Sequence, residues 1–280
     1  MNKQTVREKP GLFAARGDLT LVTLFSVVAA LLMAVASAAG LFFPAIFYPT
    51  EELFENFAVN DVVNLVLILP ILLASMLSAR RGELIGLLFW QGALLAVVYN
   101  YLVYIFGMPL DWKQFFYVPL VILSGYALVR LVAAIDSQYV RDRLAGRVKE
   151  KLSGGLLIGF GILIAFRAVS MLVGSLSAPA GLPATEIGVL ISDLTSAILW
   201  LLGGVFLWRH KALGYVTGAG LLFQASMLFV GLIAFLLLQP VMTDAPFMLV
   251  DVAVVTLMGL VCSIPFVFFV RGVISSRFPD

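Results

Sequence analysis

The chain has 280 residues, of which 62% are hydrophobic and 12% are charged, and its mean hydropathy is +1.07. Because charged residues make up about a quarter of an ordinary soluble domain, this composition excludes a soluble globular protein and predicts a multi-pass protein of the cell membrane. The formal net charge of +2 says little by itself, since orientation in a membrane depends on where Lys and Arg lie.

Missing residue types exclude several kinds of catalytic and cofactor site. Cys262 is the only cysteine and His210 is the only histidine. A disulfide, a bis-histidine haem site and a zinc site of His and Cys ligands therefore cannot be built within the chain. No lysine falls within an apolar segment, which rules out a retinal Schiff base, and no Gly-rich nucleotide motif follows a strand pattern. We expect no metal, no cofactor, no nucleic-acid partner and no catalytic residue.

Eight apolar segments are long enough to cross a bilayer as helices, which takes about 20 residues each. They cover residues 19–43, 61–77, 84–106, 115–134, 154–176, 187–208, 213–238 and 248–270. The first follows a basic arm, which predicts a signal anchor that stays in the protein. The loops on the side of that arm are all basic, and the opposite loops together hold one lysine, Lys113. The positive-inside rule therefore predicts that both termini are cytoplasmic.

Two segments outside the predicted spans have helical patterns of their own. In residues 44–60, Thr50 is suited to cap a short helix with Leu53 and Phe57 on one side, which we expect to lie in the outer head-group layer. In residues 136–153, apolar side chains recur every four residues among basic ones. This pattern predicts one basic amphipathic helix at the cytoplasmic face, in contact with anionic lipid head groups. Its apolar residues are Val140, Leu144, Val148 and Leu152.

The two halves of the chain look duplicated. Residues 25–28 align with residues 166–169, Asn64 aligns with Asp193, and Gly92 aligns with Gly220, in the same order over four spans. Because four is an even number of crossings, both halves enter the membrane from the same side. We expect two parallel four-helix repeats related by a pseudo-two-fold axis along the membrane normal. The first repeat covers residues 1–135, the linker helix residues 136–153 and the second repeat residues 154–280.

Two charged residues lie inside neighbouring predicted spans of the second half. Arg167 lies about 14 Å from the outer end of its helix, and Asp193 lies about 9 Å from the outer start of the next one. An arginine side chain is long enough to cover the difference. Because an ionised side chain in hydrocarbon costs several kcal/mol, we expect Arg167 and Asp193 to form a pair. The pair would serve either to fix helix register or as a site for ligand binding or proton coupling.

Other polar groups within the spans are carboxyl and amide side chains, which also need partners in hydrocarbon. Asp61 opens the predicted second span, where a helix-start role is favoured over ligand contact. Tyr101 and Tyr104 have the pattern of interfacial belt residues. Together with the charged pair, the polar groups give the candidate ligand-binding set: Arg167, Asp193, Asn64, Asp61, Asn100 and Gln224.

Glycines and prolines within the spans predict where helices approach closely or bend. Gly155 and Gly159 have the small-xxx-small spacing that permits close helix contact. Pro70, Pro119 and Pro265 fall inside the second, fourth and eighth spans, and each removes a backbone hydrogen bond.

A pattern in the second to fourth spans gives a resemblance to known proteins. Residues 78–82 read Ser-Ala-Arg-Arg-Gly, and they are followed by Trp90, Gly92 and the run Tyr-Asn-Tyr at 99–101. This pattern resembles a family of uncharacterised multi-span integral membrane proteins of bacteria and archaea, to which no activity is assigned. The resemblance implies a hydrophobic helical bundle and supplies no catalytic residues.

The sequence leaves three functions open. The first is a carrier or ligand-binding protein for a small molecule or ion, with a polar cavity between the repeats near Arg167, Asp193, Asn64 and Asn100. The second is a non-catalytic subunit or scaffold that binds other membrane proteins. The third is an intramembrane enzyme acting on a lipid, with Asp193 and Asp61 as acid and base. The lack of a complete catalytic set favours a protein that is not an enzyme.

Overall fold

The computed structural model describes residues 19–175 and 181–275, and these residues form helices and no strands. Within these two described ranges, eight helices are long and apolar enough to cross a membrane. The second is continuous from Glu51 to Arg80 and comprises α3, the π-helical segment η1 and α4. In chain order the elements are α1 (Thr20–Phe42), α2 (Pro44–Phe47), α3 (Glu51–Val63), η1 (Asn64–Ile68), α4 (Leu69–Arg80), α5 (Leu84–Gly107), α6 (Gln114–Ala134), α7 (Ser137–Leu144), α8 (Glu150–Ser175), α9 (Ala184–Trp208), α10 (Ala212–Met242) and α11 (Leu249–Ser275).

The second span starts ten residues earlier than predicted. Thr50 caps α3 as expected, accepting a hydrogen bond from the Leu53 backbone N–H at 3.3 Å. The helix does not stay separate from the span, because Leu53 and Phe57 are buried against the bundle and no helix-breaking residue follows. The prediction of an independent helix in the head-group layer is therefore wrong. The π-helical segment η1 ends at Ile68, two residues before Pro70, and the proline cannot donate a helical hydrogen bond.

The linker between the halves is not one long helix. Asp136 caps α7 by accepting from the backbone N–H groups of Gln138 and Tyr139 at 3.0 and 3.1 Å. α7 ends at Leu144, and Gly146 follows with φ of 75°, a left-handed conformation that glycine adopts without strain. The prediction of one helix over residues 136–153 is therefore wrong: Leu152 belongs to α8 and is 44% exposed. Val140, Leu144 and Val148 do share a buried face.

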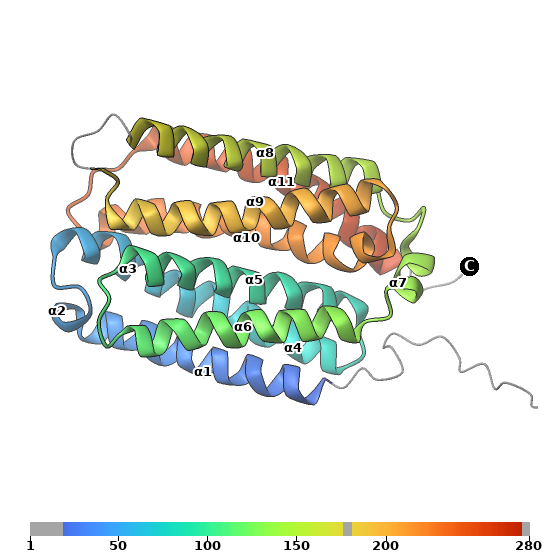
Figure 1. Ribbon diagram of the computed structural model, residues 1–280, viewed down its shortest axis with the longest axis horizontal. Helices are drawn as coiled ribbons and strands as arrows, with labels where there is room; N and C mark the ends of the chain where they lie inside the picture. Colours follow the sequence, from blue (N-terminus) through green and yellow to red (C-terminus); the bar gives the residue numbers. More distant parts are fainter. Residues whose placement is uncertain (1–18, 176–180, 276–280) are drawn as a thin grey trace, which may run out of the picture.

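α5 is the central helix of the bundle. The most apolar part of α5 is 78% buried, whereas no other span exceeds 44%. It contacts α4 and α6 next to it in the chain and also α9 and α10 from the second half. α1 lies at one edge of the bundle and α8 at the opposite edge (Figure 1). A side chain on α5 can therefore reach either half of the molecule.

Glycines allow α5 and α10 to cross at short distance. A Cβ atom added to Gly92 on α5 would lie 2.5 Å from the carbonyl oxygen of Gly220 on α10, and one added to Gly220 would lie 3.3 Å from the backbone nitrogen of Gly92. Beside this crossing Phe89 stacks on Phe223 with ring centroids 4.6 Å apart. The two halves of the chain are thus in backbone contact at the centre of the bundle.

The close contact between α8 and α9 uses other glycines than the predicted ones. A Cβ on Gly154 would lie 2.7 Å from the carbonyl oxygen of Gly204, and a Cβ on Gly204 would lie 2.8 Å from that of Gly154. Gly155 instead faces the ring of Trp208, and the position of a Cβ at Gly159 is open space. The prediction of a Gly155–Gly159 contact surface is therefore wrong, because the helix face that meets α9 begins one residue earlier.

Substitution of Gly92 by alanine should test the α5–α10 crossing. The added methyl group would overlap the Gly220 backbone, so we expect Gly92→Ala to lower the free energy of unfolding by about 1–3 kcal/mol. Thermal unfolding of the purified protein in mild detergent measures this. Gly125→Ala on α6 is the matched control, because a Cβ there meets nothing within 4 Å and alanine favours a helix by up to about 1 kcal/mol. If both variants lose the same free energy of unfolding, the close α5–α10 contact at Gly92 is contradicted.

Candidate functional site

The predicted ion pair between Arg167 and Asp193 is confirmed. The Arg167 guanidinium on α8 donates through Nη1 to Oδ2 of Asp193 on α9. Tyr99 on α5 donates its hydroxyl to the other carboxylate oxygen, Oδ1, at 2.8 Å. The Asp193 side chain is 7% exposed and the Arg167 side chain is 52% exposed. The carboxylate is therefore buried and held from two helices, whereas the guanidinium reaches it from the edge of the bundle.

A close contact between α5 and α9 at a glycine explains why Tyr99 reaches the Asp193 carboxylate. A Cβ at Gly188 on α9 would lie 2.5 Å from the carbonyl oxygen of Val103 on α5. The two helices run in opposite directions (Figure 1), so residues after Gly188 face residues before Val103. Asp193 and Tyr99 meet just beyond that contact. The sequence does not point to Tyr99, because it is one of several tyrosines on α5 and its facing depends on the helix packing.

Asn100, the next residue on α5, belongs to a different cluster. Its Nδ2 donates to Oδ1 of Asn64 at 2.8 Å. Asn64 in turn donates to the hydroxyl of Ser37 at 3.4 Å, and this hydroxyl lies 3.2 Å from that of Tyr101. All four side chains are buried. They join α1, η1 and α5 by hydrogen bonds within the first half of the chain, as amide side chains do between packed apolar helices.

Asp61 forms a second buried cluster in the first half. It is 1% exposed and has no cationic partner among the described residues. Tyr48 donates to its Oδ2, and Tyr104 donates to its Oδ1 at 2.9 Å. The Tyr104 hydroxyl also lies 3.1 Å from the carbonyl oxygen of Phe57. Gly40 on α1 leaves the necessary space, since a Cβ at that position would collide with the Asp61 carboxylate and the Tyr48 hydroxyl.

These contacts correct two predictions about the first half. Asp61 does not begin a helix, because α3 starts at Glu51 and Asp61 lies well inside it. Tyr101 and Tyr104 are not interfacial belt residues: both are 0% exposed. Burial raises the pKa of Tyr48 far above its usual value, and the neighbouring Asp61 carboxylate acts in the same direction. The Tyr48 hydroxyl therefore keeps its proton at neutral pH and acts as a donor to Asp61.

Gln224 lies apart from both groups, at the contact between α9 and α10. Trp200 donates its indole N–H to Oε1 of Gln224 at 2.6 Å, and Nε2 of Gln224 donates to the Ser196 hydroxyl at 3.2 Å. Gln224 is 1% exposed and Trp200 is fully buried. Both ends of the amide are satisfied by α9, so this contact joins two helices and leaves no group free for a ligand.

The structure thus divides the six predicted site residues into separate clusters. Arg167 and Asp193 lie together with Tyr99, Asn64 and Asn100 lie together, and Asp61 and Gln224 each have partners of their own. Among the described residues no hydrogen bond joins the Arg167–Asp193 pair to the Asn64–Asn100 pair. Arg167 is the only one of the six that is substantially exposed. It is therefore the group that a molecule outside the bundle can reach.

Comparison with known proteins gives no further assignment. No protein family, no curated protein and no solved structure matches the chain. The resemblance to multi-span membrane proteins of bacteria and archaea stays a prediction.

Substitution of the charged pair should reveal how much stability it contributes. Arg167→Met leaves Asp193 buried with only the Tyr99 donor, so we expect it to lower the free energy of unfolding by about 3–5 kcal/mol. Asp193→Leu should cost less, because Arg167 is half-exposed. The double variant should recover most of the loss, since neither charge is then left without its partner. Thermal unfolding of all three variants in mild detergent provides the double-mutant cycle.

An arginine without an acidic neighbour provides the control for this cycle. Arg130 on α6 is exposed and forms no ion pair with the described residues. Arg130→Met should therefore unfold like the parent protein. If Arg167→Met also unfolds like the parent, the pair does not stabilise the fold.

Proposed function

We propose that the chain is a multi-pass protein of the cell membrane with both termini in the cytoplasm. α7 and the C-terminal end of α11 lie at the same end of the bundle, where Arg147 donates to the carbonyl oxygen of Ser275 at 3.2 Å (Figure 1). The helix ends and connections there are basic, and by the positive-inside rule this end faces the cytoplasm. At the opposite end the lysine Lys113 is paired with Asp111 at 2.5 Å, so its charge is locally neutralised.

Two parallel four-helix repeats are the second part of the proposal. Gly92 and Gly220, which align in the duplicated sequence, meet each other at the α5–α10 crossing. Equivalent residues can touch in this way only near the axis that relates two repeats. In addition, Gly86 is fitted against the backbone of the last turn of α4, and Gly214 against that of the last turn of α9. These matching contacts support a pseudo-two-fold axis that passes between α5 and α10.

The function that the geometry supports best is binding or carriage of a small anionic molecule at Arg167. The observation that supports this function is the difference in exposure between the two side chains of the ion pair. The Asp193 side chain is 7% exposed, but the Arg167 side chain is 52% exposed. A guanidinium has five N–H donors, and the described contacts of Arg167 use Nη1 alone. No described contact uses its Nε or Nη2 donors. A carboxylate or phosphate group of a ligand would satisfy them with paired hydrogen bonds.

Placement along the helices also supports a site at Arg167. Arg167 lies about 12 Å along α8 from its outer end at Ser175, deep within the span. Hydrocarbon offers no acceptors there, so exposed N–H donors at that depth favour a ligand or a polar opening. Asp193 on α9 binds the guanidinium, and Tyr99 on α5 binds the other oxygen of that carboxylate. The site would then lie between the second repeat and the central helix of the first.

A subunit role in a larger membrane complex is the second candidate, and the same exposure favours it. An acidic side chain of a partner protein would satisfy the free donors of Arg167 as well as a small anion would. The two candidates differ in whether the lone chain is able to respond to a soluble ligand.

An intramembrane enzyme with Asp193 and Asp61 as acid and base receives no support. Asp193 is bonded to Arg167 and Tyr99, while Asp61 is bonded to Tyr48 and Tyr104. Two carboxyl groups that share an acid–base reaction need to face one substrate. Here each is enclosed by its own partners.

Ligand-dependent thermal stabilisation tests the proposed function. The purified chain in mild detergent is heated with a panel of small carboxylates and phosphates. We expect at least one to raise the melting temperature, equivalent to about 2.7 kcal/mol when the ligand is at 100 times its Kd. The Arg167→Met/Asp193→Leu double variant should lose this response, and Arg130→Met should keep it.

The opposite outcome is also informative. If no anion stabilises the lone chain, and the protein purified under the same conditions retains a stoichiometric partner, the ligand-binding function is wrong and the subunit role is favoured.

A further inference from the structure

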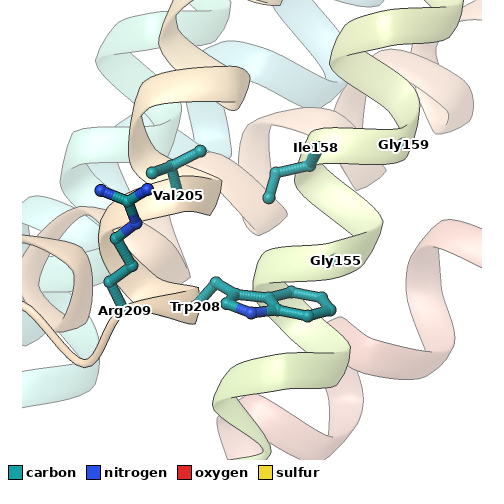
Figure 2. A pocket seen from close by; sticks show the side chains of 6 residues that line it. All are labelled: Gly155, Ile158, Gly159, Val205, Trp208 and Arg209. Carbon is teal, nitrogen blue, oxygen red and sulfur yellow. The ribbon is translucent and has the colours of Figure 1, made fainter.

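A groove of about 440 Å³ runs between α8 and α9 near the basic end of the bundle. Figure 2 shows the six residues that line it: Gly155, Ile158, Gly159, Val205, Trp208 and Arg209. Its volume is within the range of about 300–1,000 Å³ that is usual for ligand pockets. Arg167 lies about 12 Å further along α8 from Gly159, so the groove is distinct from the candidate site described above.

The shape of the groove follows from the glycines of α8. A Cβ at Gly159 would meet nothing within 4 Å, and Gly155 is faced only by the ring of Trp208. The indole ring lies across the lower end of the groove, while Ile158 projects into it from α8 (Figure 2). The contact of Gly154 with Gly204 brings α8 and α9 together beside it. The result is an apolar slot whose walls are side chains from two helices and whose α8 side includes bare backbone.

The charge at the groove is positive and is not compensated within the described part of the chain. Arg209, at the C-terminal end of α9, is exposed, and its guanidinium forms no hydrogen bond or ion pair with described residues. The exposed Lys211 follows two residues later. No lining residue is acidic. Arginine and lysine at the end of an apolar helix lie at the level of the lipid head groups, where each contributes about 1 kcal/mol of attraction to anionic lipid.

We propose that this groove is a binding site for an anionic phospholipid of the leaflet at the basic end. The phosphate binds the Arg209 guanidinium, and one acyl chain lies in the slot along Gly155 and Gly159 against Trp208. The occupant is a lipid, and not a helix of another protein, because the slot combines apolar walls with an uncompensated cation on its α9 side, beside Val205 (Figure 2). A phospholipid has this same division between an apolar chain and an anionic group.

Fluorescence quenching by brominated lipid tests the proposal directly. Of the four tryptophans, Trp90 and Trp200 are fully buried and Trp112 is 47% exposed. In a Trp112→Phe background, Trp208 is therefore the remaining exposed tryptophan. Phosphatidylglycerol with brominated acyl chains is titrated into the full chain in phosphatidylcholine bilayers. We expect saturable quenching at a low fraction of the brominated lipid, and weaker quenching by brominated phosphatidylcholine.

Two variants separate the head-group contact from the acyl slot. Arg209→Gln should weaken the apparent affinity for phosphatidylglycerol about fivefold, since it removes one interfacial charge. Gly159→Leu should abolish saturable quenching by filling the slot, and because space is open there the fold should tolerate it. Arg130→Gln and Gly125→Leu on α6 are the matched controls and should bind like the parent.

The proposal is wrong if Arg209→Gln and Gly159→Leu are quenched like their controls, or if both brominated lipids quench equally. It is also wrong if Gly159→Leu leaves lipid quenching unchanged but dissociates a dimer or a bound partner, because the groove is then a helix-docking surface. Melting temperatures of the variants without added anionic lipid exclude misfolding as the cause of any loss.

Discussion

A charge inside an apolar bundle needs a partner, and this constraint determines how the second half of the molecule joins the first. Asp193 is buried, and it is held by Arg167 from α8 and by Tyr99 from α5. Leaving such a carboxylate without partners costs several kcal/mol. The three helices must therefore meet at this depth. They are able to do so because Gly188 lets α9 approach the backbone of α5 near Val103.

The central helix α5 separates the polar groups of the two halves. Tyr99 faces Asp193 in the second half, whereas the adjacent Asn100 faces Asn64 in the first. Consecutive residues on a helix point in directions about 100° apart, so a single helix between two packed halves can supply polar contacts to both. The amide cluster is satisfied within the bundle and joins helices. Of the two groups of described residues that α5 contacts here, the pair at Arg167 keeps donors free for a molecule outside, which is why the proposed ligand site is placed there.

The sequence predicts those features that depend on one segment or on one strong energetic demand. Segment length and hydropathy predict the eight apolar helices, and the cost of isolated charges predicts the Arg167–Asp193 pair. Segment length, hydropathy and the cost of isolated charges do not show which side of a helix will be buried. Tyr104 has the sequence pattern of an interfacial residue, yet it is buried and bonded to Asp61. The start of α3 at Glu51 and the break of the linker at Gly146 depend on tertiary burial and on one left-handed residue.

The central claim, that the free side of Arg167 faces a polar opening, can be measured by spin-label accessibility. Ser170 is exposed and lies three residues beyond Arg167, on the same side of α8. Val169 is also exposed, at the same depth but on a different side. With the buried Cys262 replaced by alanine, a nitroxide is placed at one position or the other. The account predicts that a water-soluble relaxation reagent reaches the label at 170 far more than the label at 169. The account is contradicted if both labels are equally accessible to oxygen and neither is accessible to the soluble reagent. Arg167 would then face lipid alone.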